Sequence, residues 1–196
     1  MDTQTKIINT SISLFAQKGY EGTSLADIAK LVGVKKPSLY NHFSSKDDIL
    51  LSALEKVFKG YNEQFFQLIT DKNSSLKATL YQIIIENAKM CWEDQDLTLF
   101  YKRMLLFPPE PLTGRINEMN IRFESEFDEM MAGLFKDSMN KDEIPTSDIQ
   151  PYLHSFNCLL DGIFTRSNVV ESFDKFEQIV EGSWQVYWNG ISNEVK

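Results

Sequence analysis

Apolar residues recur along nearly the whole chain at spacings of three and four, which is the period of an amphipathic helix. No segment alternates apolar and polar residues as a half-buried strand does, so the sequence predicts an all-α protein with about nine helices. We expect helices at residues 3–18, 24–32, 45–69, 76–93, 97–106, 113–139, 147–170 and 173–191, and a short helix with Leu39 and Phe43 on its inner side before residue 45.

Several of these helices carry start or stop signals in the sequence. Three begin with a serine followed three residues later by an acid or an amide, so that the hydroxyl can accept from a free backbone N–H: Ser24–Asp27, Ser45–Asp48 and Ser147–Gln150. Gly19 is a natural helix stop, and we expect polar or proline-bearing breaks at 71–75, 107–111 and 140–146.

The sequence predicts two domains, residues 1–45 and residues 46–196, with no flexible linker between them. Three short helices in about 45 residues are near the lower limit for an independent core. We therefore expect the first domain to pack against the beginning of the helix at 45–69 and to depend on that contact for its stability.

The most specific stretch of the sequence runs from Ser24 to Phe43 and has the form of a helix-turn-helix reader. Gly33 can supply a tight turn with positive φ, and Val34 can bury that turn between the helices. The short helix that follows is the second helix of the motif, and its Leu39 and Phe43 can pack inward. Its opposite side can then enter the major groove of DNA. The outward side chains are then Lys36, Ser38, Tyr40 and His42.

The charge distribution is compatible with a surface that faces phosphates. The net charge is −8, but residues 1–56 hold seven Lys and Arg against six Asp and Glu, while the remainder holds 13 against 22. No acidic residue lies between Ile28 and Ser45, whereas lysines stand at 30, 35, 36 and 46. Lysines that neutralise phosphates release counterions, although a solvated lysine face would have the same pattern.

The run from Phe15 to Leu54 reads FAQKGYEGTSLADIAKLVGVKKPSLYNHFSSKDDILLSAL, and it closely resembles the N-terminal pattern of the TetR family of regulators. The resemblance covers about a quarter of the chain. It departs from the family at Lys35, where the family often has serine, so the reading helix lacks its usual side-chain cap and Lys35 is free to point at a phosphate.

The resemblance implies that the start of the recognition helix faces the groove and that Tyr40 and His42 lie near the DNA backbone. The alternative for these two residues is that they are surface-packed aromatics. Ser24 and Lys46 begin their own helices, where free N–H groups favour phosphate. The expected DNA contacts are Ser24, Lys35, Lys36, Pro37, Ser38, Tyr40, Asn41, His42 and Lys46.

For the rest of the chain the resemblance implies a small-molecule pocket. We hypothesise that a ligand bound there displaces the helix at 45–69, to which the DNA reader is attached. The mixture of aromatic and flexible side chains suits an apolar ligand, and the alternative is ordinary core. The candidate pocket residues are Trp92, Phe100, Tyr101, Met104, Phe123 and Phe127.

The resemblance also implies a homodimer through the last two helices, which a reader of so few bases needs for specificity. Both helices carry an apolar stripe that a second copy could cover, and the alternative is packing within one chain. The stripes are Tyr152, Phe156, Leu159, Leu160, Ile163 and Phe164, and Ile179, Val180, Trp184, Tyr187 and Trp188; the interface candidates are Phe156, Leu160, Ile163, Phe164, Val180, Trp184 and Tyr187.

Catalytic and metal-binding motifs are not found in the sequence. Cys91 and Cys158 have no CxxC spacing, and the two histidines, His42 and His154, stand apart without an HExxH pattern. Glu124 and Asp128 lie four apart, but we interpret them as a solvated face. We therefore expect no enzyme, no cofactor and no metal.

Together these features predict a sequence-specific, DNA-binding transcriptional regulator, most simply a repressor released from a palindromic operator by a small apolar ligand. The alternative is a ligand-independent DNA-binding protein or a helical protein-interaction module. The opening MDTQTKIINT has neither a basic nor an apolar leader segment, and no run approaches the length of a membrane span, so we expect a cytoplasmic protein.

Overall fold

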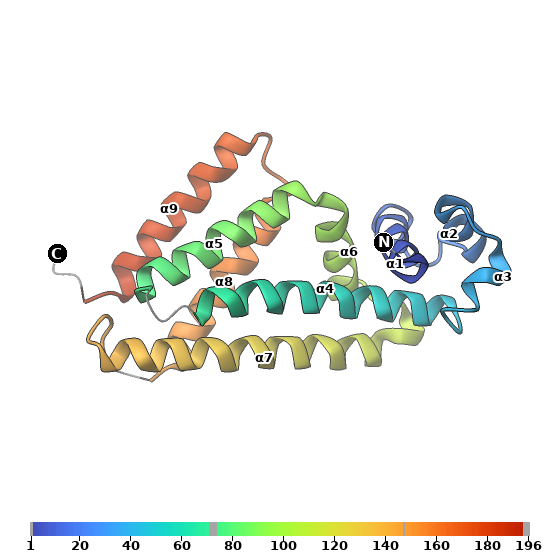
Figure 1. The fold of residues 1–196 in the computed structure, drawn as a ribbon. Helices are drawn as coiled ribbons and strands as arrows, with labels where there is room; N and C mark the ends of the chain where they lie inside the picture. The colour runs from blue at the N-terminus through green and yellow to red at the C-terminus, as the bar shows by residue number, and fades with distance from the viewer. Residues whose placement is uncertain (1, 71–73, 147, 194–196) are drawn as a thin grey trace. The chain divides into compact units, whose positions relative to one another are not determined.

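The computed structural model describes residues 2–70, 74–146 and 148–193, and this part of the chain is helical without a strand (Figure 1). The helices are α1 Thr3–Lys18, α2 Leu25–Val32, α3 Lys36–Leu39, α4 Lys46–Ile69, α5 Leu76–Glu93, α6 Gln95–Leu106, α7 Thr113–Asn140, α8 Gln150–Arg166 and α9 Phe173–Ile191, with a single 3₁₀ turn, η1, at Glu110–Leu112. For the described residues the predicted all-α class and the number of α-helices are confirmed.

Two of the predicted serine starts are present. Ser24 Oγ accepts from the N–H of Asp27 at 3.1 Å, and Asp27 Oδ2 accepts from the N–H of Ser24 at 3.1 Å. Ser45 Oγ accepts from the N–H of Asp48 at 3.1 Å. These bonds satisfy backbone donors that have no partner inside their own helix.

The beginning and end of α8 differ from the sequence prediction. Ser147, expected to cap this helix, lies outside the described residues, as do residues 71–73 of the expected break. The helix begins at Gln150, whose N–H donates to Asp148 Oδ1 at 3.1 Å. The helix ends at Arg166, four residues before the predicted end at about Val170, and residues 167–169 form a turn in which the N–H of Val169 donates to the carbonyl of Arg166.

The chain forms two compact units, and α4 and α7 each contribute residues to both. The first unit comprises residues 1–61 and 95–123, and the second comprises 62–94 and 124–196. The expected domain boundary after residue 45 stays a prediction. The first unit joins α1, α2 and α3 with α6 and with the first residues of α4 and α7.

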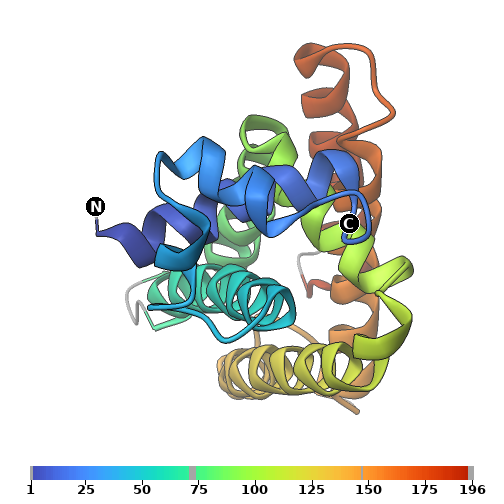
Figure 2. The same cartoon turned by 90° about the vertical axis from the view of Figure 1, so that its right-hand side faces the viewer.

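Phe15 is at the centre of the first unit and is fully buried. Its ring stacks on Tyr20 at a centroid distance of 6.1 Å and on Phe100 of α6 at 6.3 Å. The helices α1 and α6 lie side by side (Figures 1 and 2). Arg103 of α6 fastens this contact, because its Nε donates to the carbonyl of Ala16 at 2.7 Å.

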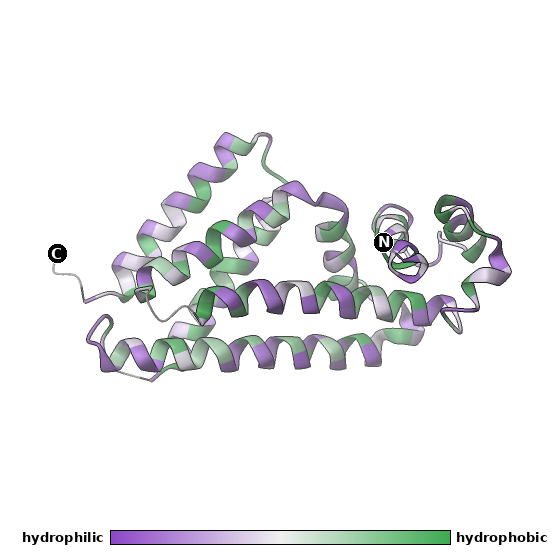
Figure 3. Ribbon diagram, in the orientation of Figure 1, coloured by the Kyte–Doolittle hydropathy of each residue, from purple (hydrophilic) through white to green (hydrophobic). Residues whose placement is uncertain are grey.

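The second unit has a largely aromatic core where α5, α8 and α9 pack together. Trp184 of α9 lies 5.6 Å from Tyr81 of α5 and 5.6 Å from Trp188, measured between ring centroids. Hydrophobic and hydrophilic residues alternate every few residues along the long helices (Figure 3), as amphipathic helices require. Within the described residues, no helix is long and apolar enough to cross a membrane.

Candidate nucleic-acid interface

The corner between α2 and α3 is a left-handed turn at Gly33. Gly33 has φ 81° and ψ 30°, a conformation that side chains with a Cβ rarely adopt. Its N–H donates to the carbonyl of Ala29 at 3.0 Å, and the N–H of Val34 donates to the same carbonyl at 3.0 Å. These bonds end α2 and fix the direction in which α3 leaves the corner.

The segment 36–43 presents one apolar side to the core, although α3 itself ends at Leu39 and does not reach Phe43 as expected. Leu39 is 1% exposed and Phe43 is 4% exposed, as their spacing predicted. The other side of the segment faces solvent: Tyr40 is 53% exposed and Ser38 is half-buried. The remaining exposed residues of this face are Lys35, Lys36, Pro37, Asn41 and His42. We call residues 35–42 other than Leu39 the reading face.

The start of α3 has no side-chain cap. Lys35 occupies the N-cap position in an extended conformation, and no side-chain hydrogen bond covers the first N–H groups of the helix. Pro37 lies in the first turn, where its missing N–H is harmless and its fixed φ suits a helix. The predicted lack of a cap is therefore confirmed, and Lys35 is exposed at this point.

Lys46 and Tyr20 join the beginning of α4 to the loop that follows α1. Lys46 Nζ donates to the carbonyl of Tyr20 at 2.8 Å and to that of Thr23 at 3.1 Å, and it lies 3.8 Å from the centre of the Tyr20 ring. The Tyr20 hydroxyl donates to Asp47, and burial together with this bond raises the pKa of Tyr20. Two of the three ammonium donors of Lys46 are thus engaged. Its contact with a phosphate stays a prediction.

Ser24 and Asp27 form the exposed start of α2. The Ser24 hydroxyl and backbone N–H both donate to the carboxylate, and these bonds hold the pKa of Asp27 below its ordinary value. The carboxylate therefore stays ionised at the positive end of the α2 dipole. A phosphate contact of Ser24 stays a prediction.

Comparison with known sequences assigns the segment that contains the reading face. Residues 7–53 match the family of bacterial regulatory proteins named tetR. Residues 7–53 therefore form an N-terminal domain of the TetR type. TetR-family proteins are DNA-binding transcription factors rather than enzymes. The match overlaps the run from Phe15 to Leu54 on which the sequence resemblance was based, so that resemblance is confirmed.

Among curated proteins, this chain is 44% identical over 81 residues to IcaR, the HTH-type negative transcriptional regulator of the biofilm operon icaADBC from Staphylococcus aureus strain Newman. The aligned region covers 41% of this chain and 43% of IcaR. The chain thus spans less than half the length of the curated relative that it matches.

Solved structures resemble the chain over nearly its whole length. The transcriptional regulator FadR from Bacillus subtilis, solved in complex with stearoyl-CoA, gives a TM-score of 0.78 at 21% identity, covering 95% of this chain and 98% of FadR. A TetR/AcrR-family regulator from Thermobifida fusca gives 0.73 at 23% identity, covering 97% and 98%. At these identities the likeness shows the fold.

The predicted pocket residues are divided between the two units. Tyr101 and Phe123 are close, with ring centroids 6.4 Å apart, and both pack on Phe58. Met104 is buried in the first unit, and Phe100 packs on Phe15 there. Trp92 and Phe127 belong to the second unit, where they pack on Phe176 and Phe65 respectively. Ligand binding by these residues stays a prediction.

The predicted dimer residues are mostly covered by their own chain. Phe156 is fully buried and packs on Phe135 and Tyr187. Leu160 and Tyr187 are half-buried, and the buried members are Ile163, Phe164, Val180 and Trp184. Packing within one chain thus accounts for most of both stripes. Their role in a dimer stays a prediction.

Sequence reasoning missed two features that involve distant parts of the chain. One is the bond from Arg103 to Ala16, which holds α6 on α1. The other is a groove lined by Asn62, Glu63 and Phe66 of α4 and by Glu126, Glu129 and Met130 of α7. The only sequence signal for the groove was Phe66, an aromatic residue next to the buried Phe65 and outside the apolar period of α4.

Proposed function

We propose that this protein is a sequence-specific DNA-binding transcriptional regulator that reads a near-palindromic operator as a homodimer. The observation that carries the proposal is the reading face, where Leu39 and Phe43 are buried while polar and basic side chains of the same segment face solvent. No acidic residue lies between Ile28 and Ser45 to oppose phosphate. A helix-turn-helix with such a face is suited to the major groove.

Different members of the reading face take different roles in this proposal. Lys36, Pro37 and Ser38 begin α3, so they are placed to reach base edges. Tyr40, Asn41 and His42 follow the helix and hold phosphate oxygens, which fixes register without reading sequence. Ser24, Lys35 and Lys46 add phosphate contacts at the starts of their helices.

Repression is the mode of regulation that the comparison favours. IcaR, which matches this chain over 81 residues, is named a negative regulator of its operon. We infer by analogy that binding of this protein to an operator blocks transcription.

The homodimer would use the exposed sides of α8 and α9 rather than the sides already buried. Val186 is 76% exposed, and Gly182 and Gly190 lie one turn to either side of it. On α8, the exposed Cys158 and Gly162 are also four residues apart. Small residues allow close approach of two helix pairs, and twofold pairing would form a four-helix bundle.

Light scattering tests the dimer directly. We expect the wild-type protein to have the mass of two chains and Val186→Glu to shift it toward one, because a carboxylate would be desolvated in the interface. Gln67→Glu, at an exposed site of α4, is the control and should leave the mass unchanged. A wild-type monomer at micromolar concentration would contradict the dimer.

Release from DNA would follow a tilt of α4 when a small ligand with an apolar body binds to the part of the chain after the reader. The 24 residues of α4 make a rod of about 36 Å, so a tilt of about 5° moves its far end by about 3 Å. A displacement of that size disturbs simultaneous docking on two half-sites.

Selection of bound sequences from random DNA tests the proposed function. A regulator should enrich one half-site in inverted repeat and prefer it over random DNA by about a thousandfold or more. The competing candidate is a ligand-independent DNA-binding or helical interaction module, which would enrich no sequence. The absence of any enriched motif would overturn the proposal that the protein is a sequence-specific regulator.

A further inference from the structure

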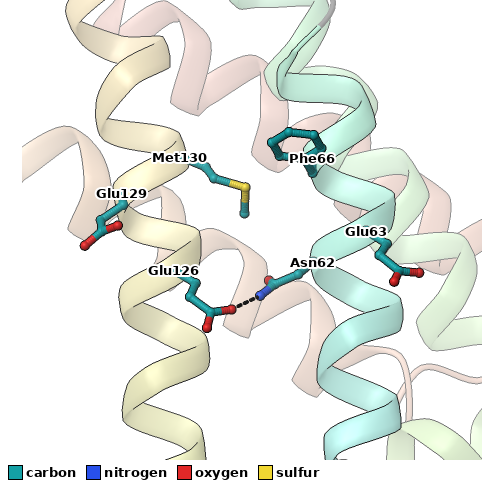
Figure 4. Close-up of a pocket in the computed structure, with 6 residues that line it drawn as sticks. All are labelled: Asn62, Glu63, Phe66, Glu126, Glu129 and Met130. Atoms are coloured by element: carbon teal, nitrogen blue, oxygen red, sulfur yellow. Dashed lines mark hydrogen bonds between the residues drawn. The ribbon is translucent and has the colours of Figure 1, made fainter.

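A groove runs between α4 and α7 within the second unit, with a volume of about 530 Å³. Volumes of roughly 300–1,000 Å³ are typical of sites for small molecules. Figure 4 shows the side chains that line it, which are Asn62, Glu63 and Phe66 from α4 and Glu126, Glu129 and Met130 from α7.

The apolar part of the groove is an aromatic ring opposite a thioether. Phe66 is 54% exposed, whereas its neighbour Phe65 is 4% exposed in the core. Met130 extends from α7 toward the Phe66 ring (Figure 4). A thioether adapts its shape to an apolar guest, and the face of an aromatic ring attracts a cation.

The polar part of the groove is negatively charged. Three of the six lining side chains are the carboxylates Glu63, Glu126 and Glu129, and none is basic. Within residues 2–70, 74–146 and 148–193, neither Glu63 nor Glu129 has an ion-pair partner. Carboxylates beside apolar walls concentrate cations and repel anions.

The amide of Asn62 gives a further requirement. Its Nδ2 donates to Glu126 Oε2 at 2.8 Å across the groove (Figure 4). Its Oδ1 is buried and accepts no hydrogen bond from the described part of the chain. A buried acceptor without a donor is costly, so a guest that brings an N–H group gains from satisfying it.

We propose that this groove binds an amphipathic organic cation, specifically a protonated amine or amidine attached to an aromatic or alkyl body. The body lies on Phe66 and Met130, the charge lies among the carboxylates, and an N–H donates to Asn62. This charge is opposite to that of stearoyl-CoA, whose phosphates are anionic and with which FadR was solved. The inference rests on the proposed function only in that such a cation would be the regulator's effector.

Calorimetric titration of the full chain without DNA tests the proposal with three probes that share one apolar body. These are 4-phenylbutylamine, 4-phenylbutanol and 4-phenylbutyrate, which are cationic, neutral and anionic at neutral pH. We expect the amine to bind about tenfold more tightly than the alcohol, and the butyrate to bind more weakly than either. Equal affinity for the amine and the alcohol would overturn the proposal.

Substitutions locate the site. The triple variant Glu63→Gln, Glu126→Gln, Glu129→Gln keeps shape and removes charge, so the preference for the amine over the alcohol should fall to within about twofold. Phe66→Leu should weaken the amine and the alcohol together. Glu118→Gln, at an exposed carboxylate of α7 outside the groove, is the control and should keep the wild-type preference.

An unchanged preference in the triple variant, with circular dichroism showing a folded protein, would place the cation elsewhere and overturn the inference. Because these titrations contain no DNA, their result does not depend on sequence-specific binding. A negative result in the DNA selection and a negative result for cation binding in the groove can therefore be told apart.

Discussion

Arg103 Nε donates to the carbonyl of Ala16 at 2.7 Å. This bond connects α6 to α1 through two residues that are 87 positions apart in the sequence. The carbonyl belongs to the last turn of α1, where backbone acceptors have no partner inside the helix. A charged donor at this end also complements the helix dipole. The α6 helix thereby serves as a cap for the first helix of the reader.

Removing the Arg103 donor should destabilise the first unit. Arg103→Met keeps most of the apolar stem and leaves the Ala16 carbonyl without this donor, so we expect the free energy of unfolding to fall by about 1–3 kcal/mol. Thermal denaturation followed by circular dichroism measures it. Arg115→Met, at an exposed arginine of α7, is the control, and an equal change in both variants would contradict the capping role.

Two glycines in open space should respond in opposite directions to alanine. A Cβ at Gly33 or at Gly60 would meet no atom within 4 Å, so packing plays no part in either change. Gly33→Ala should cost about 1 kcal/mol because of its positive φ. Gly60→Ala, inside α4, should stabilise by about 0.5–1 kcal/mol. Denaturant unfolding of the two variants would contradict the turn geometry if Gly33→Ala were also stabilising.

Lys46 should contribute to the stability of the protein without DNA, whereas an exposed lysine of the reading face should make no such contribution. Lys46→Met removes the donors to the Tyr20 and Thr23 carbonyls, so we expect a lower melting temperature without DNA. Lys36→Met is the matched comparison, since Lys36 is exposed. Equal melting temperatures for both variants and the wild type would show that the Lys46 contacts add nothing.

The carboxylate of Glu124 should lower stability at neutral pH. Partial desolvation, with Asp161 and Asp128 nearby, raises the pKa of Glu124 above its ordinary value of 4.5. The folded state therefore holds the proton more tightly than the unfolded state, and the penalty of ionisation disappears once the pH falls below 4.5. Glu124→Gln should raise the melting temperature at pH 7 and have little effect at pH 4. The opposite pH dependence would contradict this environment.

The reader was predictable because its constraints are local in the sequence. The serine of a capping box, the glycine of the corner and the spacing of Leu39 and Phe43 each specify a neighbour within a few residues. The structure reproduces all of them. In α4, the apolar residues at helical spacing are buried except the last of them, Leu68, which is half-buried; the buried ones are Ile49, Leu50, Ala53, Val57, Tyr61 and Phe65.

Contacts between helices that are distant in the chain could not be predicted from the sequence. Periodicity shows which side of a helix is apolar but not which partner covers it. The candidate pocket set therefore included Phe100, which packs on Phe15 of α1, together with Trp92, which packs on Phe176 of α9. The groove at Phe66 was missed for the same reason, because it depends on which residues of α7 lie opposite α4.

The affinity of the full chain for its selected operator, measured for Lys36→Glu and Tyr40→Glu, tests the central claim most directly. Both residues are exposed on the reading face, so folding should persist in both variants. At Lys36, in the first turn of α3, a carboxylate also suits the helix dipole. We predict that each glutamate weakens operator binding by at least about a hundredfold, since it repels phosphate where a contact was made. His154→Glu, at an exposed site of α8, should bind as the wild type does. Wild-type affinity in both reading-face variants would contradict the account.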